Sequence, residues 1–137
     1  MYAELHALSH YSFLRGASSP EELVAQAKRL GYRALALTDE CSLAGVVRAH
    51  LAAKAHALAL IVGAEFVCGC GLKVIALATS RRGYAALSRL ISRARRASPK
   101  GRYALAREDL ADALADCLIL WLPPAGTAAA AGRCRTC

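Results

Sequence analysis

The sequence predicts an α/β fold in which short apolar strands alternate with helices. Residues 34–37 and 60–62 are short, uninterrupted apolar runs, as expected for parallel strands that are covered on both faces. Between the first strand and residue 34 lies a strong helix start, with Ser19 as N-cap, Pro20 at the first helical position and Glu22 closing a capping box. Alternation of this kind is typical of an α/β sheet.

The strands can be placed in chain order. Residues 3–8 alternate apolar and polar side chains, which indicates a first strand, and a turn-rich loop follows it. Residues 66–68 and 73–78 flank Gly69-Cys70-Gly71, so we expect a hairpin there and a local departure from strand–helix alternation. The strands that the sequence predicts lie at 3–8, 34–37, 60–62, 66–68, 73–78 and 117–121.

The helices follow from caps and from apolar spacing. Leu23, Ala27 and Leu30 have the i, i+4, i+7 spacing of a helix that Gly31 ends. We expect Ser42 to cap a second helix and Ser80 to open a third. The predicted helices span residues 20–30, 43–57, 82–97 and 108–114.

Length and composition limit the class of protein. With 137 residues the chain forms one domain at most, and no run of about 18 apolar residues lacks a charge. Met1 leads directly into the first strand, without a secretory leader. We therefore expect a cytoplasmic protein without a membrane partner, whose six cysteines stay reduced. The CxxC spacing of Cys134 and Cys137 has no second pair beside it, so metal binding is not expected there.

The net charge of +8 is concentrated in one block. Residues 81–107 contain nine Lys or Arg and no acidic residue. Such a block favours polyanions, nucleic acid first, through phosphate contacts and counterion release. The candidate nucleic-acid-binding residues are Arg89, Arg93, Arg95 and Arg96. A solvated helix face in an arginine-rich protein is an equally good interpretation of the same block.

Polar side chains follow three of the predicted strands. His6 lies near the end of the first strand, Asp39 and Glu40 follow the second, and Glu65 follows the third. Enzymes with α/β barrels assemble their sites from side chains at successive strand ends. These four residues are therefore the candidate site residues.

These motifs resemble the PHP (polymerase and histidinol phosphatase) family. Residues 5–17 and 37–45 are similar to the N-terminus of bacterial C-family DNA polymerase alpha subunits, and residues 38–50 are similar to their error-prone, damage-associated branch. The resemblance implies a distorted (βα)7 barrel, of which residues 1–122 would supply about the first four to five strands and leave the barrel open. Because the composition changes after Pro123-Pro124, we treat residues 123–137 as an aberrant or disordered tail.

The family's site binds divalent metals through His, Asp and Glu. By position, His6 matches the first histidine of a His-x-His motif, and Leu8 replaces the second. Asp39 matches the aspartate of a Thr-Asp-His motif whose histidine is Glu40 here, and Glu65 matches the bridging carboxylate. Metal-assisted phosphoester hydrolysis needs paired cations, and leucine cannot ligate one. We therefore expect a degenerate site that holds Mn²⁺, Mg²⁺ or Zn²⁺ at most weakly, and no phosphoesterase activity.

For function, the resemblance implies an N-terminal fragment of an error-prone DNA-directed DNA polymerase, active in DNA replication and translesion synthesis with Mg²⁺. The fragment itself would lack the palm and its catalytic residues, and would meet DNA and polymerase accessory proteins through the parent enzyme. Two alternatives stay open: a stand-alone phosphoesterase of the histidinol-phosphatase kind, and a non-enzymatic nucleic-acid-binding module.

Overall fold

The computed structural model describes residues 2–123 and contains one five-stranded sheet. In order across the sheet, the strands are β1 (Ala3–Ala7), β2 (Ala34–Leu37), β3 (Ala59–Val67), β4 (Lys73–Ala78) and β5 (Cys117–Leu122). The first three are mutually parallel, whereas β4 is antiparallel to both β3 and β5. The helices are α1 (Pro20–Arg29), α2 (Val46–Ala55), α3 (Arg81–Arg96) and α4 (Arg107–Ala113).

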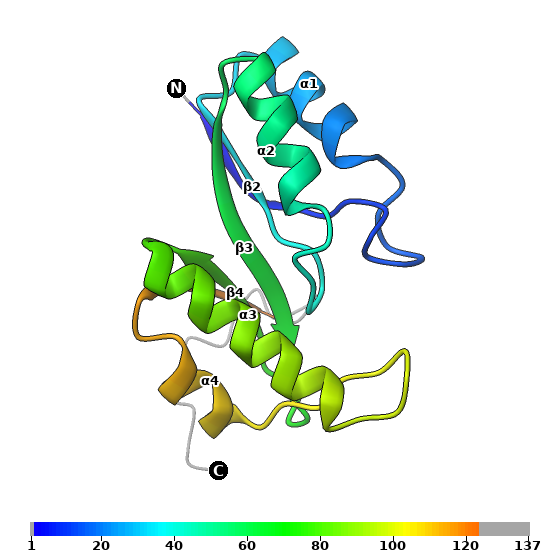
Figure 1. Cartoon of the computed structure of the whole chain (residues 1–137), viewed down its shortest axis with the longest axis vertical. Coiled ribbons are helices and arrows are strands. Elements are labelled where there is room, and N and C mark those ends of the chain that lie inside the picture. The colour runs from blue at the N-terminus through cyan, green and yellow to red at the C-terminus, as the bar shows by residue number, and fades with distance from the viewer. Residues whose placement is uncertain (1, 124–137) are drawn as a thin grey trace.

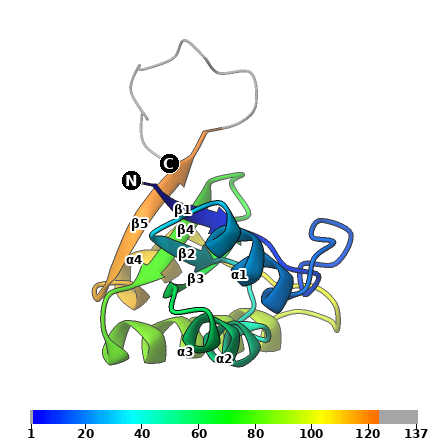
Figure 2. The ribbon, with the colours of Figure 1, turned by 90° about the horizontal axis from the view of Figure 1, so that it is seen from above.

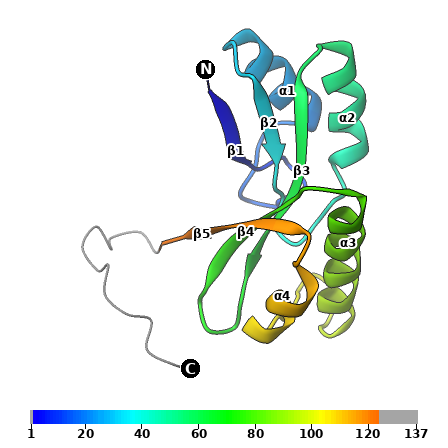
Figure 3. The same cartoon turned by 90° about the vertical axis from the view of Figure 1, so that its left-hand side faces the viewer.

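The sheet is a curled, open half-barrel with the helices on one side (Figure 3). Its edge strands β1 and β5 do not pair with each other in the described part of the chain. The expected α/β fold, with the first strands of an unclosed barrel, is thus confirmed. Helices α2 and α3 follow one another along the long axis of the molecule, so they overlap when it is seen from above (Figures 1 and 2).

Strand β3 joins the two halves of the sheet and runs along most of the molecule (Figure 1). Its residues 59–62 pair with β2 in parallel, and residues 63–67 pair with β4 in antiparallel orientation. The prediction of two separate strands, at 60–62 and 66–68, was therefore wrong. Gly63 sits where the partner changes, and a Cβ there would lie 2.7 Å from the carbonyl oxygen of Ala76. Glycine is needed at this position because the backbone of β4 approaches too closely for a side chain.

The first two helices differ in how well local sequence signals predicted where they begin. Helix α1 begins as expected: the Ser19 hydroxyl accepts from the backbone N–H of Glu22, and the Glu22 carboxylate accepts from the N–H of Ser19. Helix α2 begins at Val46, later than the predicted Leu43, and its N-cap is Gly45. The Ser42 hydroxyl instead accepts from the N–H of Ala44 within the preceding turn.

Each half of the sheet has its own core. Val24, Leu37 and Ala49 belong to a buried cluster between β1, β2 and the first two helices. Phe66, Leu87 and Leu90 belong to a second cluster beneath α3 and α4. Strand β4 alternates between faces, since Val74 and Ala76 join the second cluster while Ile75 and Leu77 pack with Ala36 on the opposite face. Both faces of the central strands are covered, which explains their nearly continuous apolar sequence.

Only the first residue of the predicted tail is among the described residues. Strand β5 ends at Leu122, and the proposed tail falls, apart from Pro123, outside the described residues. Within residues 2–123, none of the helices is long and apolar enough to cross a bilayer.

Candidate functional site

Three of the four predicted ligands meet where β2 ends beside β3. Glu40 forms an isolated parallel bridge with Glu65. The backbone N–H of Glu65 donates to the Asp39 carbonyl at 3.2 Å, and the N–H of Cys41 donates to the Glu65 carbonyl at 2.8 Å. His6 reaches the same place from β1, with Nε2 2.7 Å from Oε2 of Glu65. Glu65 itself lies inside β3, which continues to Val67, and not at the end of a strand as the sequence had suggested.

Glu65 is the centre of this cluster and is fully buried. Burial alone would raise the pKa of its carboxyl, but hydrogen bonds from Arg15, His6 and Lys73 outweigh burial and hold that pKa below its ordinary value. The Lys73 ammonium lies 3.2 Å from Oε2 of Glu65. The carboxylate is thus ionised and surrounded by donors.

The principal cation of the cluster is Arg15. One of its terminal nitrogens, Nη1, bridges the two carboxylates, lying 2.6 Å from Oε2 of Glu40 and also donating to Oε1 of Glu65. The other, Nη2, donates to Oε2 of Glu65 at 3.2 Å. These carboxylates raise the pKa of the guanidinium far above its ordinary value. Arg15 therefore lies between the two carboxylates and donates to both.

A tight loop places Arg15 there. The carbonyl of Ser12 accepts from the backbone N–H groups of both Arg15 and Gly16, each at 2.9 Å. A Cβ on Gly16 would lie 2.0 Å from the carbonyl oxygen of Ser9, so only glycine fits where the loop closes on itself. The positive φ of Leu14 (61°) completes the turn.

Glu40 has a second donor on the side away from Arg15. The Tyr103 hydroxyl donates to Oε1 of Glu40 at 2.9 Å and accepts from the N–H of Val67 at 3.0 Å. Burial, together with the Glu40 carboxylate, raises the pKa of this phenol. Tyr103 thereby ties the loop before α4 to the strand-end cluster.

Asp39 does not join the other predicted ligands. Its buried carboxylate accepts from Ser9 N–H (2.7 Å), from the Ser9 hydroxyl (2.7 Å) and from the Ser12 hydroxyl (2.6 Å). All three donors belong to the loop after β1. In this arrangement Asp39 fastens that loop, and through it Arg15, to the end of β2.

A divalent metal does not fit this donor set. The charges of Glu40 and Glu65 are already balanced by those of Arg15 and Lys73, so no excess negative charge remains to attract a dication. The oxygens of Asp39 are engaged by serine donors. In the part of the chain that the structure describes, no group of three or more His, Cys, Asp or Glu side chains is arranged to hold a metal ion.

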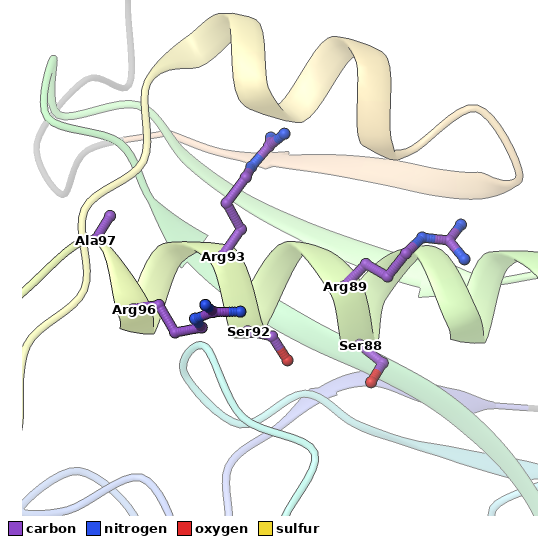
Figure 4. A pocket seen from close by; sticks show the side chains of 6 residues that line it. All are labelled: Ser88, Arg89, Ser92, Arg93, Arg96 and Ala97. Carbon is purple, nitrogen blue, oxygen red and sulfur yellow. The ribbon is translucent and has the colours of Figure 1, made fainter.

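The predicted nucleic-acid residues separate into two groups. Arg95 is directed inward: its guanidinium donates to the carbonyls of Glu40 and Cys41 and lies 5.2 Å from the Tyr103 ring centroid. Arg89, Arg93 and Arg96 instead line a shallow groove along α3 (Figure 4). The structure thus keeps three of the four arginines on one surface.

The sequence reasoning did not identify Arg15, Lys73 or Tyr103 as members of the cluster. Arg15 carried a signal, since it is a single basic residue next to Gly16 in the loop that follows the first strand. Lys73 and Tyr103 carried no such signal. Lys73 reaches Glu65 only because β4 pairs with β3, and Tyr103 reaches Glu40 only through the loop before α4.

The open half-barrel and its strand-end carboxylates define a class of protein. The sequence profile of the PHP domain matches residues 4–133, and the chain belongs to the PHP domain family. Among its curated relatives are proteins named error-prone DNA polymerase. That of Dechloromonas aromatica is 62% identical over 89% of this chain, and that of Pseudomonas aeruginosa is 59% identical over 89%. The chain spans about 12% of the length of each of these two relatives.

Solved structures share the fold. A protein from Bifidobacterium adolescentis, described as a metal-dependent phosphoesterase, superposes with a TM-score of 0.55 at 20% identity, covering 83% of this chain and 49% of that one. An amidohydrolase from Chromobacterium violaceum, described as having bound sulfate and no metal, gives a TM-score of 0.59 at 25% identity, covering 70% and 34%. This chain is therefore similar in sequence to polymerase N-termini and in fold to hydrolases that include a metal-dependent one.

Proposed function

We propose that this PHP domain is a structural, non-hydrolytic part of an error-prone DNA polymerase. Its parent would carry out template-directed nucleotidyl transfer on DNA in the bacterial cytoplasm, during replication and damage-tolerant synthesis, with Mg²⁺ bound outside this domain. The proposal rests on relatives that are 51–62% identical and carry that name. In this setting the domain supplies a stable platform and no phosphoesterase chemistry.

The observation that carries the structural role is the position of Arg15. Its guanidinium bridges Glu40 and Glu65, the carboxylates that would otherwise be free to bind a cation. A fixed internal cation neutralises these groups without metal supply and also ties the β1–α1 loop to β3. Leu8 supports the same conclusion, since a histidine in its place would have added a ligand. An internal ion pair thus replaces the metal as the element that holds the strand ends together.

Metal content and hydrolysis test this directly. The purified chain is incubated with Mn²⁺ or Zn²⁺, desalted and analysed by plasma mass spectrometry, and is then assayed for release of nucleotides from the 3′ end of labelled single-stranded DNA. We expect substoichiometric metal and no metal-dependent release. One equivalent of retained metal together with nucleotide release would overturn the proposal.

A paired variant makes this test sharper. Removing the guanidinium and restoring a histidine, in Arg15→Ala combined with Leu8→His, leaves His6, Glu40 and Glu65 with an uncompensated negative charge. We expect Mn²⁺ to raise the melting temperature of this double variant and to leave that of the wild type and of Leu8→His alone unchanged. Equal stabilisation of all three proteins would indicate that Arg15 does not block the site.

The role in the polymerase needs a separate measurement. When Arg15→Ala is placed in the polymerase that carries this domain, primer extension on an undamaged template should become more heat-sensitive, while its rate at low temperature stays unchanged. Loss of extension at every temperature would instead assign the cluster a direct part in catalysis.

The stand-alone phosphoesterase remains the second candidate, because a structural neighbour is described as a metal-dependent phosphoesterase. At 20% identity that likeness concerns the fold alone. Two-metal hydrolysis needs carboxylates that are free to bridge cations, and here both are engaged by Arg15. Hydrolysis of a chromogenic phosphate monoester by the wild-type chain would favour this candidate.

A further inference from the structure

A second charged surface of the molecule is a groove along helix α3. It has a volume of about 540 Å³ and is lined by Ser88, Arg89, Ser92, Arg93, Arg96 and Ala97. Figure 4 shows the arginine side chains extending from successive turns of one helix, with the two serines beside them. All of these residues except Ala97 belong to α3, so the surface does not depend on how distant segments are arranged.

The charge of this groove is not balanced internally. Arg89 and Arg96 form no ion pair with the described side chains, those of residues 2–111 and 114–123. Arg93 is partly neutralised, with Nη2 2.9 Å from Oδ1 of Asp109 on α4. Helix α3 itself carries six arginines and no acidic residue. Like charges one helical turn apart repel each other and destabilise a helix, and bound anions would relieve that repulsion.

The spacing of the side chains suits a chain of phosphates more than a single ion. Arg89 and Arg96 are seven residues apart, which is about 10 Å along a helix. Between them, Ser92 offers a hydroxyl of the kind that donates to phosphate oxygens. Arginine also binds phosphate in a bidentate manner. A linear array of donors and charges of this length matches several consecutive groups of a polyanion.

We propose that this groove binds the phosphodiester backbone of duplex DNA. The binding of a polyphosphate backbone follows from the charge and spacing alone, whereas the choice of DNA rests on the proposed function. The surface consists of Ser88, Arg89, Ser92, Arg93 and Arg96, and Arg95 is excluded because its guanidinium is bound to the carbonyls of Glu40 and Cys41. Contacts to phosphates carry no base information, so binding should be independent of sequence.

The test is DNA binding by the purified chain, measured by fluorescence anisotropy with a labelled 20-base-pair duplex at several salt concentrations. The variant Arg89→Ala with Arg96→Ala removes the two unpaired charges. The control, Arg29→Ala with Lys54→Ala, removes the same net charge from exposed positions on α1 and α2. Circular dichroism and melting temperature check that both proteins fold.

We expect the groove variant to bind roughly tenfold more weakly and to lower the slope of log K against log salt by about two, one for each lost phosphate contact. The control should change both quantities much less, and two duplexes of unrelated sequence should give the same result. Equal weakening by both variants would show that net charge alone governs DNA binding, and it would overturn the proposal that the groove is the binding site.

Two further outcomes separate this proposal from others. Vesicles that contain phosphatidylglycerol are the competing polyanion, and binding to them, lost in the groove variant without any DNA binding, would overturn the choice of DNA. Wild-type DNA binding that the groove variant leaves intact would also overturn the inference. Neither result bears on the metal test, so the proposed function stands or fails separately.

Discussion

The guanidinium of Arg15 donates through both of its terminal nitrogens to the buried carboxylate of Glu65. The two residues are 50 positions apart, one in the loop after β1 and the other in the middle of β3. Their contact converts a set of strand-end acids into an internally neutralised cluster. Both the stability of the domain and its response to acid should therefore depend on this pair.

Arg15→Ala should lower the free energy of unfolding by about 2 kcal/mol, because the buried Glu65 carboxylate loses its charged donor Arg15 and keeps only His6 and Lys73. Arg15→Lys should restore only part of this loss, since an ammonium cannot donate in a planar fork to two carboxylates. Urea denaturation followed by circular dichroism measures both. If the alanine variant lost less than the lysine variant, the bridging geometry would not be what stabilises the fold.

Acid should destabilise the domain through Glu65. The folded-state pKa of this carboxyl is lowered below its usual value near 4.5, so its stabilisation is fully present above that pH. It should be lost as the pH falls further, through the folded pKa, because the folded carboxylate must then take up a proton. Melting temperature measured from pH 7 to pH 3 tests this. Glu65→Gln should be less stable at neutral pH and should show a flatter curve in acid; parallel curves would contradict the assignment.

Local signals predicted the parts of the fold that depend on nearby residues. The cap at Ser19, the apolar run of β2 and the hairpin around Gly69–Gly71 are each decided within a few positions. Strand β3 was misjudged because its continuity depends on two different partner strands, β2 along one edge and β4 along the other. No periodicity along the chain distinguishes a strand that changes partner from a strand that ends at Gly63.

The sequence predicted most of the acidic residues of the site correctly, but it did not predict which side chains contact one another. His6, Glu40 and Glu65 do meet, because β3 continues beyond its parallel pairing with β2 and carries Glu65 past the end of that strand. Asp39 follows the same strand as Glu40, yet adjacent residues of an extended chain point in opposite directions, and it reaches Ser9 and Ser12 instead. The cation between the acids comes from a loop, and its position depends on the turn at Gly16, which the pattern of strands and helices does not reveal.

Gly16→Ala should be strongly destabilising. The new methyl group would lie 2.0 Å from the carbonyl oxygen of Ser9, so the loop must open and move Arg15. We expect a loss of about 3 kcal/mol, the upper end for overpacking, because the obstacle is backbone and not a flexible side chain. Gly69→Ala is the matched control, since its Cβ would meet only the Leu105 carbonyl oxygen at 4.0 Å and should change stability by less than about 0.5 kcal/mol. Similar losses for both would contradict the role of the Gly16 turn.

Asp109→Asn should strengthen DNA binding. The Asp109 carboxylate pairs with Arg93 through Oδ1 and accepts from the backbone N–H of Ala106 through Oδ2. An asparagine can keep the backbone hydrogen bond through its carbonyl oxygen, and it removes the negative charge that partly neutralises Arg93 in the groove. The slope of log K against log salt should then steepen by about one. Asp116→Asn, which frees Arg82 at the other end of α3, raises the net charge equally. Because Arg82 does not line the groove, that variant should have the smaller effect, and equal gains would show that net charge alone governs binding.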